Sequence, residues 1–164
     1  MKSLVVYYSR SNNTETVAKE IAKAVKGEIK KIELIKEVSF FWAAVTALLG
    51  KEGKIKHVDF DFSDYENIFI GSPVWAGKTS TPINTFLNQA DFTGKNVYVF
   101  LTQADEKTPS LVFESMTARI EARGGKVKDH FFMQTNMKSP LTSEQVTKSV
   151  EEWLKNFRDG SFRS

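Results

Sequence analysis

Short apolar, β-branched runs alternate along the chain with segments whose apolar residues recur every three or four positions. Residues 4–8 form the first run and predict a buried strand, and Val17, Ile21 and Val25 then predict one face of a helix. Residues 29–35 instead alternate isoleucine with lysine and glutamate, which is typical of an edge strand. We expect strands over residues 4–8, 29–35, 67–71, 96–101 and 127–133, each followed by a helix, with helices starting near residues 13, 40, 81, 108 and 142.

Capping signals support three of these helix starts. Thr81 precedes Pro82, a residue favoured in the first helical turn, and is expected to be the N-cap. The pair Thr108-Pro109 is expected to open the next helix. Thr142, three residues before a glutamine, predicts a capping box for the last helix.

Five strands in strict alternation with five helices predict an α/β fold. Right-handed crossovers place helices on both faces of a parallel sheet, so we expect a three-layer, doubly wound sandwich. The apolar strands suit the centre of this five-stranded sheet and the charged strand suits an edge, which fits the strand order 2-1-3-4-5. Residues 1–164 are expected to form a single domain, because roughly 150 residues is an ordinary domain size. Ligands of such sheets bind at the carboxyl ends of the strands.

The amino-acid composition argues against several kinds of functional site. The chain has no cysteine and only two histidines, so we expect no disulfide, no metal site and no thiol nucleophile. Its longest apolar stretch, residues 40–49, is far shorter than the roughly 20 residues that span a bilayer. The net charge is +3, and no segment interleaves basic and aromatic residues as a nucleic-acid surface does. We therefore expect a cytoplasmic protein that neither enters a membrane nor binds nucleic acid.

The loop after the first strand is rich in hydroxyl and amide side chains. It consists of Ser9, Arg10, Ser11, Asn12, Asn13 and Thr14. It leads directly into a helix, whose free N–H groups and dipole favour an anion, and either asparagine can take the left-handed conformation of a tight turn. The loop is thus either a phosphate-binding loop or a polar loop with ordinary capping residues. It matches neither the P-loop motif nor the glycine-rich dinucleotide motif.

Two further loops are expected at the same edge of the sheet. The loop after the third strand contains Pro73, Val74, Trp75, Ala76 and Gly77. Its tryptophan either stacks on a planar ligand ring or folds back into the core. The loop after the fourth strand contains Thr102, Gln103, Ala104 and Asp105, whose backbone groups could bond the polar edge of a ring.

Residues 8–16, Tyr-Ser-Arg-Ser-Asn-Asn-Thr-Glu-Thr, and residues 70–75, Ile-Gly-Ser-Pro-Val-Trp, together resemble the flavodoxins. The chain looks most like the short-chain flavodoxin-like proteins of bacteria and archaea, over about residues 2–158. The resemblance implies a flavodoxin-like fold that holds one FMN without a covalent bond. It also implies that the first loop holds the phosphate, that the second borders the isoalloxazine with Trp75 stacked on it, and that the third lines the polar edge of the ring.

The sequence departs from the family pattern in ways that bear on function. The first loop has asparagine where the family usually has glycine, and the third loop supplies no aromatic ring to cover the flavin. Residues 40–49 begin with three aromatic residues and predict either a buried helix or a contact surface for a partner or a homodimer. Residues 57–108 hold three basic and seven acidic residues, and we expect this charge to oppose negative charge on the reduced flavin.

The expected function is electron transfer to redox partner proteins, with the flavin supplying the chemistry. Two other functions remain open at this point. An NAD(P)H-dependent FMN or quinone oxidoreductase would use the uncovered flavin face at the third loop to stack its substrate. A flavodoxin-like interaction module without flavin would bind its partner through residues 40–49.

Overall fold

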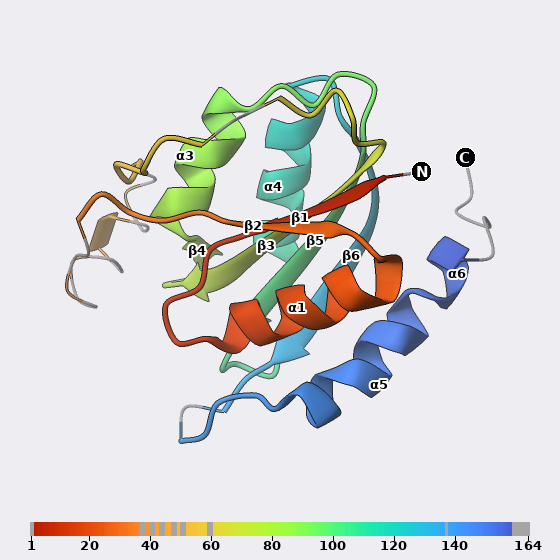
Figure 1. The fold of residues 1–164 in the computed structure, drawn as a ribbon. Coiled ribbons are helices and arrows are strands. Elements are labelled where there is room, and N and C mark those ends of the chain that lie inside the picture. Colours follow the sequence, from red (N-terminus) through yellow and green to blue (C-terminus); the bar gives the residue numbers. More distant parts are fainter. Residues whose placement is uncertain are drawn as a thin grey trace.

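Five parallel strands form the middle layer of the molecule. The computed structural model describes residues 2–36, 39, 42, 45–46, 49, 52–58, 61–136 and 138–158. Its strands are β1 (Ser3–Tyr7), β2 (Glu28–Lys31), β3 (Asn67–Trp75), β4 (Lys78–Thr79), β5 (Asn96–Gln103) and β6 (Lys126–Gln134). The sheet order is β2-β1-β3-β5-β6, and each neighbouring pair is parallel (Figure 1). The predicted order is therefore confirmed, with β5 and β6 as its fourth and fifth strands. The short β4 is an addition that pairs antiparallel with the end of β3.

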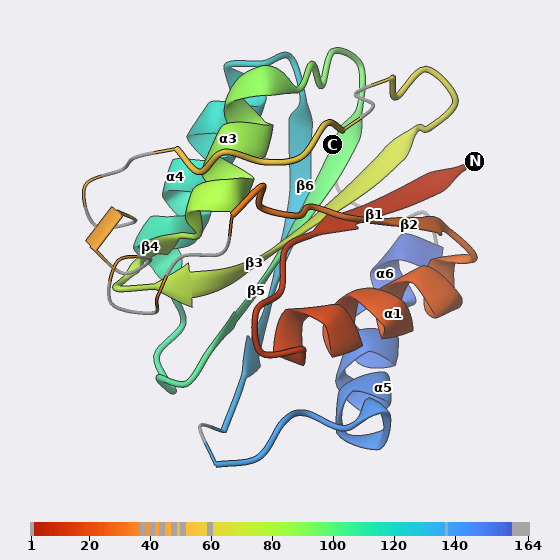
Figure 2. The ribbon, with the colours of Figure 1, turned by 60° about the vertical axis from the view of Figure 1, so that its left-hand side comes forward.

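Helices cover both faces of the sheet. They are α1 (Asn13–Val25), α3 (Thr81–Gln89), α4 (Ser110–Glu121), α5 (Ser143–Trp153) and α6 (Lys155–Arg158). Figures 1 and 2 show α1 and α5 side by side on one face, and α3 with α4 on the other. The three-layer sandwich is as predicted. The helix expected over residues 40–49 falls largely outside the described residues.

Alternate residues of the central strands supply two separate cores. Leu4 and Val6 belong to the core under α3 and α4, whereas Val5 and Tyr7 belong to the core under α1 and α5. All four side chains are at most 4% exposed. A strand buried on both faces needs a continuous apolar run, which is why residues 4–8 lack alternation.

Two predicted details are corrected. The edge strand β2 ends at Lys31, and the chain then leaves the sheet, because Ile32 and Leu34 are buried in the core under α3 and α4. Leu34 forms an isolated antiparallel bridge with Ile55. Helix α3 starts one residue earlier than expected, so its N-cap is Ser80.

Helix α5 begins as predicted for the helix near residue 142. The side chain of Thr142 accepts a hydrogen bond from Gln145 N, and the Gln145 side chain accepts one from Thr142 N, which completes the capping box. Val146, Val150 and Leu154 are then buried against the sheet.

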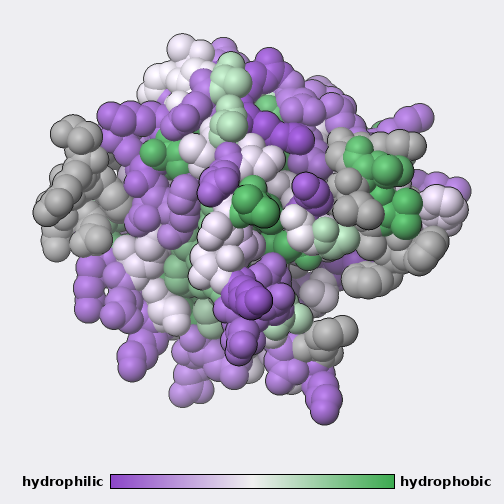
Figure 3. Space-filling model, turned by 180° about the vertical axis from the view of Figure 1, so that it is seen from behind, coloured by the Kyte–Doolittle hydropathy of each residue, from purple (hydrophilic) through white to green (hydrophobic). Residues whose placement is uncertain are grey.

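One face of the molecule offers little continuous apolar area among the described residues. The face in Figure 3 is mostly hydrophilic, with hydrophobic side chains in small separate spots. In the part of the chain that the structure describes, every helix is too short or too polar to cross a membrane.

Candidate functional site

The predicted loops meet at one edge of the sheet. The segments after β1, β3, β5 and β6 emerge together at the lower left of Figure 1, because parallel strands end on the same side. Thr14 Oγ1 lies 2.8 Å from Thr102 Oγ1, and both residues are buried, so the first loop contacts the third. The rings of Tyr8 and Trp75 meet edge to face with centroids 5.5 Å apart, so the residue that precedes the first loop contacts the second loop.

The first loop turns sharply into α1 at Asn12. This residue has a φ of 64°, in the left-handed region, and it is the N-cap of the helix. Asparagine tolerates this conformation better than most residues with a Cβ atom. Its carbonyl accepts from Thr16 N at 2.9 Å, but its side chain forms no capping hydrogen bond with the helix. The first N–H groups of α1 are therefore left to another acceptor.

The Ser9 hydroxyl is the clearest candidate for a hydrogen bond to a ligand. Its side chain is 7% exposed, and Ser9 Oγ is buried without a hydrogen-bond partner among the described residues. Leaving such a hydroxyl unsatisfied costs about 1–3 kcal/mol. An anion at the start of α1 would accept from both the hydroxyl and the helix N–H groups, so the loop fits a phosphate.

The remaining residues of the first loop have different surroundings. Arg10 and Ser11 are exposed. Asn13 Oδ1 accepts from Leu141 N at 2.8 Å, which ties the start of α1 to the segment after β6. The side-chain oxygen of Asn13 is thus already hydrogen-bonded within the protein, and this bond helps to position the first loop.

A carboxylate lies one helical residue beyond the loop, and two lysines neutralise it. Glu15 bonds Lys19 at 2.7 Å and Lys31 at 2.8 Å. The hydrogen bonds from these lysines lower the pKa of Glu15 to about 2. Burial, helped by the Glu15 charge, raises the pKa of the neighbouring Tyr7 to about 12. Because two lysines neutralise the charge of Glu15, its carboxylate does not repel an anion at the first loop.

The second loop is a tight hairpin between β3 and β4. Ala76 and Gly77 both have positive φ values, 48° and 71°, as a two-residue type I′ turn requires. Ser72 Oγ lies 2.9 Å from Ser80 Oγ and accepts from Ser80 N at 3.1 Å, which closes the hairpin at its base. Pro73 and Val74 are half-buried.

Trp75 lies inside the protein. It is 7% exposed and belongs to the core under α3 and α4. Of the two placements that the sequence left open, the structure shows the one in which the ring packs in the core. Stacking of Trp75 on a flavin stays a prediction, and it requires the ring to gain a free face.

The third loop is held by its own hydrogen bonds. Gln103 Nε2 donates to the Lys107 carbonyl, and Asp105 Oδ1 accepts from Lys107 N at 2.9 Å. Ala104 and Asp105 are exposed. Only Thr102 is buried at the contact with Thr14. The exposed residues of this loop include no aromatic ring.

Two hollows flank the first loop and bring in residues that the sequence did not indicate. One, of about 520 Å³, is lined by Ser9, Arg10 and Asn12 together with Lys31 and Lys56. The other, of about 590 Å³, is lined by Ala104 and by residues of the segment 133–145, including Lys138. The strand order could have indicated Lys31 and Lys138, because Lys31 ends β2 and Lys138 follows β6.

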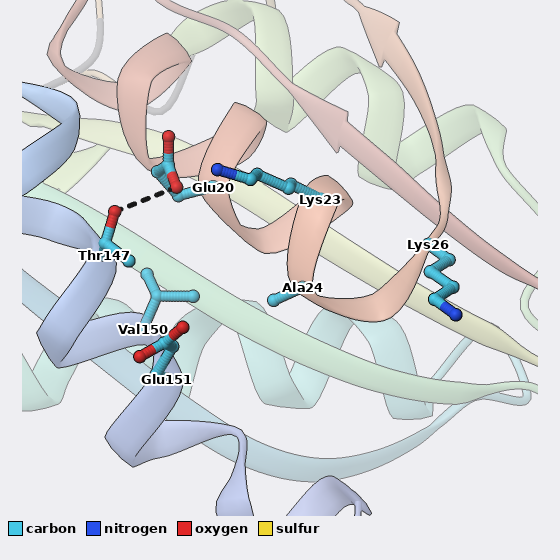
Figure 4. Close-up of a pocket in the computed structure, with 7 residues that line it drawn as sticks. All are labelled: Glu20, Lys23, Ala24, Lys26, Thr147, Val150 and Glu151. Atoms are coloured by element: carbon cyan, nitrogen blue, oxygen red, sulfur yellow. Dashed lines mark hydrogen bonds between the residues drawn. The ribbon is translucent and has the colours of Figure 1, made fainter.

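A third hollow, of about 250 Å³, lies between α1 and α5 (Figure 4). Thr147 Oγ1 donates to Glu20 Oε2 at 3.0 Å across it. None of the predicted site residues lines this hollow. It is a seam between two packed helices, away from the loop edge.

The expected negative field at the site is wrong. Of the acidic residues in 57–108, Asp61, Asp64 and Glu66 precede β3 and Asp91 precedes β5. These four therefore lie at the opposite edge of the sheet, where the parallel strands begin. Asp105 and Glu106 do reach the loop edge, together with Lys78 and Lys107.

Comparisons with known proteins agree with this architecture. Residues 50–154 match the family model of the flavodoxins. A flavoprotein from Lactobacillus acidophilus NCFM, solved in complex with FMN, is 26% identical, with a TM-score of 0.69 over 80% of this chain and 92% of that one. Its apo-form, determined by NMR, gives 25% identity and a TM-score of 0.62 over 84% and 95% of the two chains.

Oxidised flavodoxin 1 from Bacillus cereus shares the fold at 18% identity, with a TM-score of 0.58 over 96% of this chain and 98% of that one. A sequence comparison with curated proteins finds no match.

Proposed function

The chain belongs to the flavodoxin family, and from this premise we propose that it binds FMN at the loop edge and transfers electrons between redox partners. One observation carries the proposal: the buried Ser9 hydroxyl lacks a partner among the described residues beside a helix start that its N-cap side chain leaves open. Bound FMN supplies the redox chemistry by accepting and returning electrons. The protein supplies the binding site, the orientation and the local charge.

The residues of the first loop have different roles in binding the phosphate. Ser9 and the N–H groups of the first turn of α1 donate hydrogen bonds to the phosphate, and the dipole of α1 favours its charge. Thr14 holds the first loop against Thr102 of the third. Asn12 supplies the turn, and Asn13 fixes the loop to the segment after β6.

The other two loops would border the ring system of FMN. The second loop would border it from Pro73 to Gly77, and the third loop, where Ala104 and Asp105 are exposed, would lie at its polar edge. Trp75 contributes either a stacking surface or, as it lies now, a rigid support beneath the hairpin.

The exposed third loop favours one second candidate, an NAD(P)H-dependent FMN or quinone oxidoreductase. Residues 104–107 are all exposed and none is aromatic, so a nicotinamide or quinone would meet little obstruction there. Stopped-flow mixing of the FMN-loaded protein with NADPH separates the two functions. Rapid bleaching of the flavin absorbance supports the oxidoreductase, and no bleaching supports the carrier.

The test of the proposed function is a fluorescence titration of the purified protein with FMN and, in parallel, with riboflavin. Riboflavin carries the same ring without the phosphate. Each charge-assisted hydrogen bond to the phosphate contributes about 1.5–3 kcal/mol, so we expect FMN to bind at least about tenfold more tightly. Equal affinity for the two ligands would exclude the phosphate site, and no binding of either would exclude the proposed function.

A further inference from the structure

The hollow on the β2 side of the first loop is larger than a phosphate group needs. It measures about 520 Å³, and its walls include Ser9 and Asn12 of the first loop. Ser9 is 7% exposed, and its hydroxyl has no hydrogen-bond partner among the described residues. An anion bonded to this hydroxyl would therefore lie beside the hollow and leave most of its volume free.

The wall that faces the first loop comes from the segment after β2. Ile32, Glu33 and Leu34 of this segment line the hollow. Main-chain pairing fixes their position, because Leu34 forms an antiparallel bridge with Ile55. In addition, Lys56 N donates to the Glu33 carbonyl oxygen at 2.8 Å. The hollow is thus held open by main-chain hydrogen bonds and needs no ligand to form.

The strand order separates this hollow from the loops proposed to border the flavin ring. Strand β1 lies between β2 and β3. The segment after β2 therefore flanks the first loop on one side, and the hairpin after β3 flanks it on the other. A flavin ring at the hairpin and a group in the hollow would lie on opposite sides of the phosphate. A ligand that fills both places must continue beyond its phosphate, as FAD does and FMN does not.

Glu33 lies where a carboxylate can bind a ribose. It follows the end of β2, about 20 residues after the first loop, which is where an acidic residue binds the adenosine ribose in many dinucleotide-binding sheets. Its side chain is 53% exposed and accepts from Lys56 Nζ at 2.9 Å. This hydrogen bond holds the pKa of Glu33 below its ordinary value, so the carboxylate is an ionised acceptor.

The other charged groups of the hollow suit phosphate diesters. Arg10, Lys31 and Lys56 line it. Lys31 is paired with Glu15 at 2.8 Å, and Lys56 is paired with Glu33. Three basic side chains against two carboxylates leave a small positive excess, which matches the single negative charge on each phosphate of a dinucleotide. The guanidinium of Arg10 can also donate two parallel hydrogen bonds to such a group.

We propose that the flavin site takes FAD as well as FMN, and that the adenylate half of FAD occupies the hollow between the first loop and residues 32–34. This rests on the proposed flavin site at the first loop. Ser9 binds the phosphate that FMN and FAD share, and Glu33 accepts hydrogen bonds from the ribose hydroxyls. Ile32 and Leu34 supply the apolar surface on which the adenine packs.

The hollow is tested first on the protein without flavin, by amide chemical shifts of ¹⁵N-labelled protein. AMP and inorganic phosphate are added separately, because AMP carries the adenosine that inorganic phosphate lacks. We expect both to shift the amides of residues 9–14 and only AMP to shift those of residues 31–34. AMP shifts confined to residues 9–14 overturn the proposal.

The same AMP titration on the FMN-loaded protein distinguishes FAD from a separate nucleotide. FMN and AMP compete for one phosphate position if the hollow continues the flavin site. We therefore expect FMN to abolish the AMP shifts at residues 31–34. Undiminished shifts would overturn the proposal and assign the hollow to a second nucleotide, such as the NAD(P)H of an oxidoreductase.

The third test compares the affinities for FAD and FMN by isothermal titration calorimetry. We expect FAD to bind about tenfold more tightly, because the adenylate half adds hydrogen bonds to charged groups. FAD binding that is equal to or weaker than FMN binding overturns the proposal. If neither flavin binds, the proposed function fails, and the AMP shifts still decide whether the hollow accepts an adenosine phosphate.

A matched pair of variants assigns the effect to Glu33. Glu33→Gln should lower the ratio of FAD affinity to FMN affinity about tenfold, because it removes the ionised acceptor for the ribose. The control Asp64→Asn removes an exposed carboxylate that is paired with Lys2, before β3 at the opposite edge, and should leave the ratio unchanged. Circular dichroism checks that both variants fold. A ratio that is unchanged in Glu33→Gln, or that falls equally in both variants, overturns the inference.

Discussion

The first and second loops both sit at the loop edge, yet they satisfy their polar groups in opposite ways. In the first loop, the Ser9 hydroxyl is buried without a partner in the described residues, and Asn12 does not cap α1 with its side chain. In the second, Ser72 and Ser80 bond each other and Trp75 is packed into the core. The polar groups of the hairpin are satisfied within the protein, whereas those of the first loop would be satisfied by an anion bound there.

This difference separates two ways in which a protein builds a cofactor site. A loop with unsatisfied groups stores binding energy, because the ligand removes a cost that the free protein bears. A self-sufficient loop instead offers a rigid wall.

Replacing the buried tryptophan should have the largest effect. Trp75→Ala should lower the free energy of unfolding by about 3–5 kcal/mol, because it removes a large side chain from a packed core. Urea unfolding followed by circular dichroism measures this. The control Trp42→Ala, at a side chain that is 59% exposed, should change stability by about 0.5 kcal/mol or less. A small loss for Trp75→Ala would mean that the hairpin does not depend on its buried ring.

A pair of serine variants should shift stability in opposite directions. Ser9→Ala removes a buried hydroxyl that has no partner among the described residues, so the free protein should gain up to about 1 kcal/mol while FMN binding weakens about tenfold. Ser72→Ala should instead cost about 1–2 kcal/mol, because Ser80 N loses its acceptor. Urea unfolding and FMN titration of both variants provide the comparison. Destabilisation of the free protein by Ser9→Ala would show that its hydroxyl is already satisfied.

The hairpin turn allows a second matched pair. Ala76 holds a φ of 48° against its Cβ atom, so Ala76→Gly should raise stability by up to about 1 kcal/mol. Gly77→Ala should cost about 1 kcal/mol by strain alone, since a Cβ atom at Gly77 would meet no atom within 4 Å among the described residues. Thermal and urea unfolding measure both changes. A loss of stability in Ala76→Gly would contradict the strained turn.

The smallest effect is the pH dependence due to Glu15. Its pKa is lowered from 4.5 to about 2 in the folded protein, so its contribution is complete above about pH 4.5 and is lost as the pH falls toward 2. Its lysine partners are 64% and 40% exposed, so solvent screening limits the contribution to roughly 1 kcal/mol. Urea unfolding from pH 7 to pH 3 should show a shallower decline in Glu15→Gln than in the unmodified protein. Parallel declines would mean that the ion pairs of Glu15 do not contribute to stability.

The fold was predictable because two patterns alternate along the chain: apolar runs that indicate strands, and apolar residues three or four positions apart that indicate helices. Continuous apolar runs indicated the central strands, and the charged run indicated the edge, which together gave the strand order. The hairpin strand β4 was not found, because Ala76-Gly77 lacks the Asn-Gly or Asp-Gly pair that usually announces a type I′ turn. The length of β2 was overestimated because Ile32 and Leu34 continue the alternating pattern. Their side chains are buried in the core, although both residues lie beyond the end of the strand.

The site was predictable only as far as strand order determines it. Parallel strands bring their following loops to one edge, so the three loops could be grouped from the sequence. The burial of Trp75 depends on the shape of the hairpin and on the space beneath it. The charge of residues 57–108 was misjudged because successive loops alternate between the two edges, so a sum over sequence mixes two surfaces that lie apart.

The pairing of α1 with α5 has a consequence for biosynthesis. The two helices share one core and meet through Glu20 and Thr147, yet α1 ends at Val25 and α5 begins at Ser143. A ribosome that adds roughly 5–20 residues per second completes α5 on the order of ten seconds after α1. During that interval the core shared by α1 and α5 lacks the side chains of α5, so the nascent chain exposes apolar surface until α5 emerges.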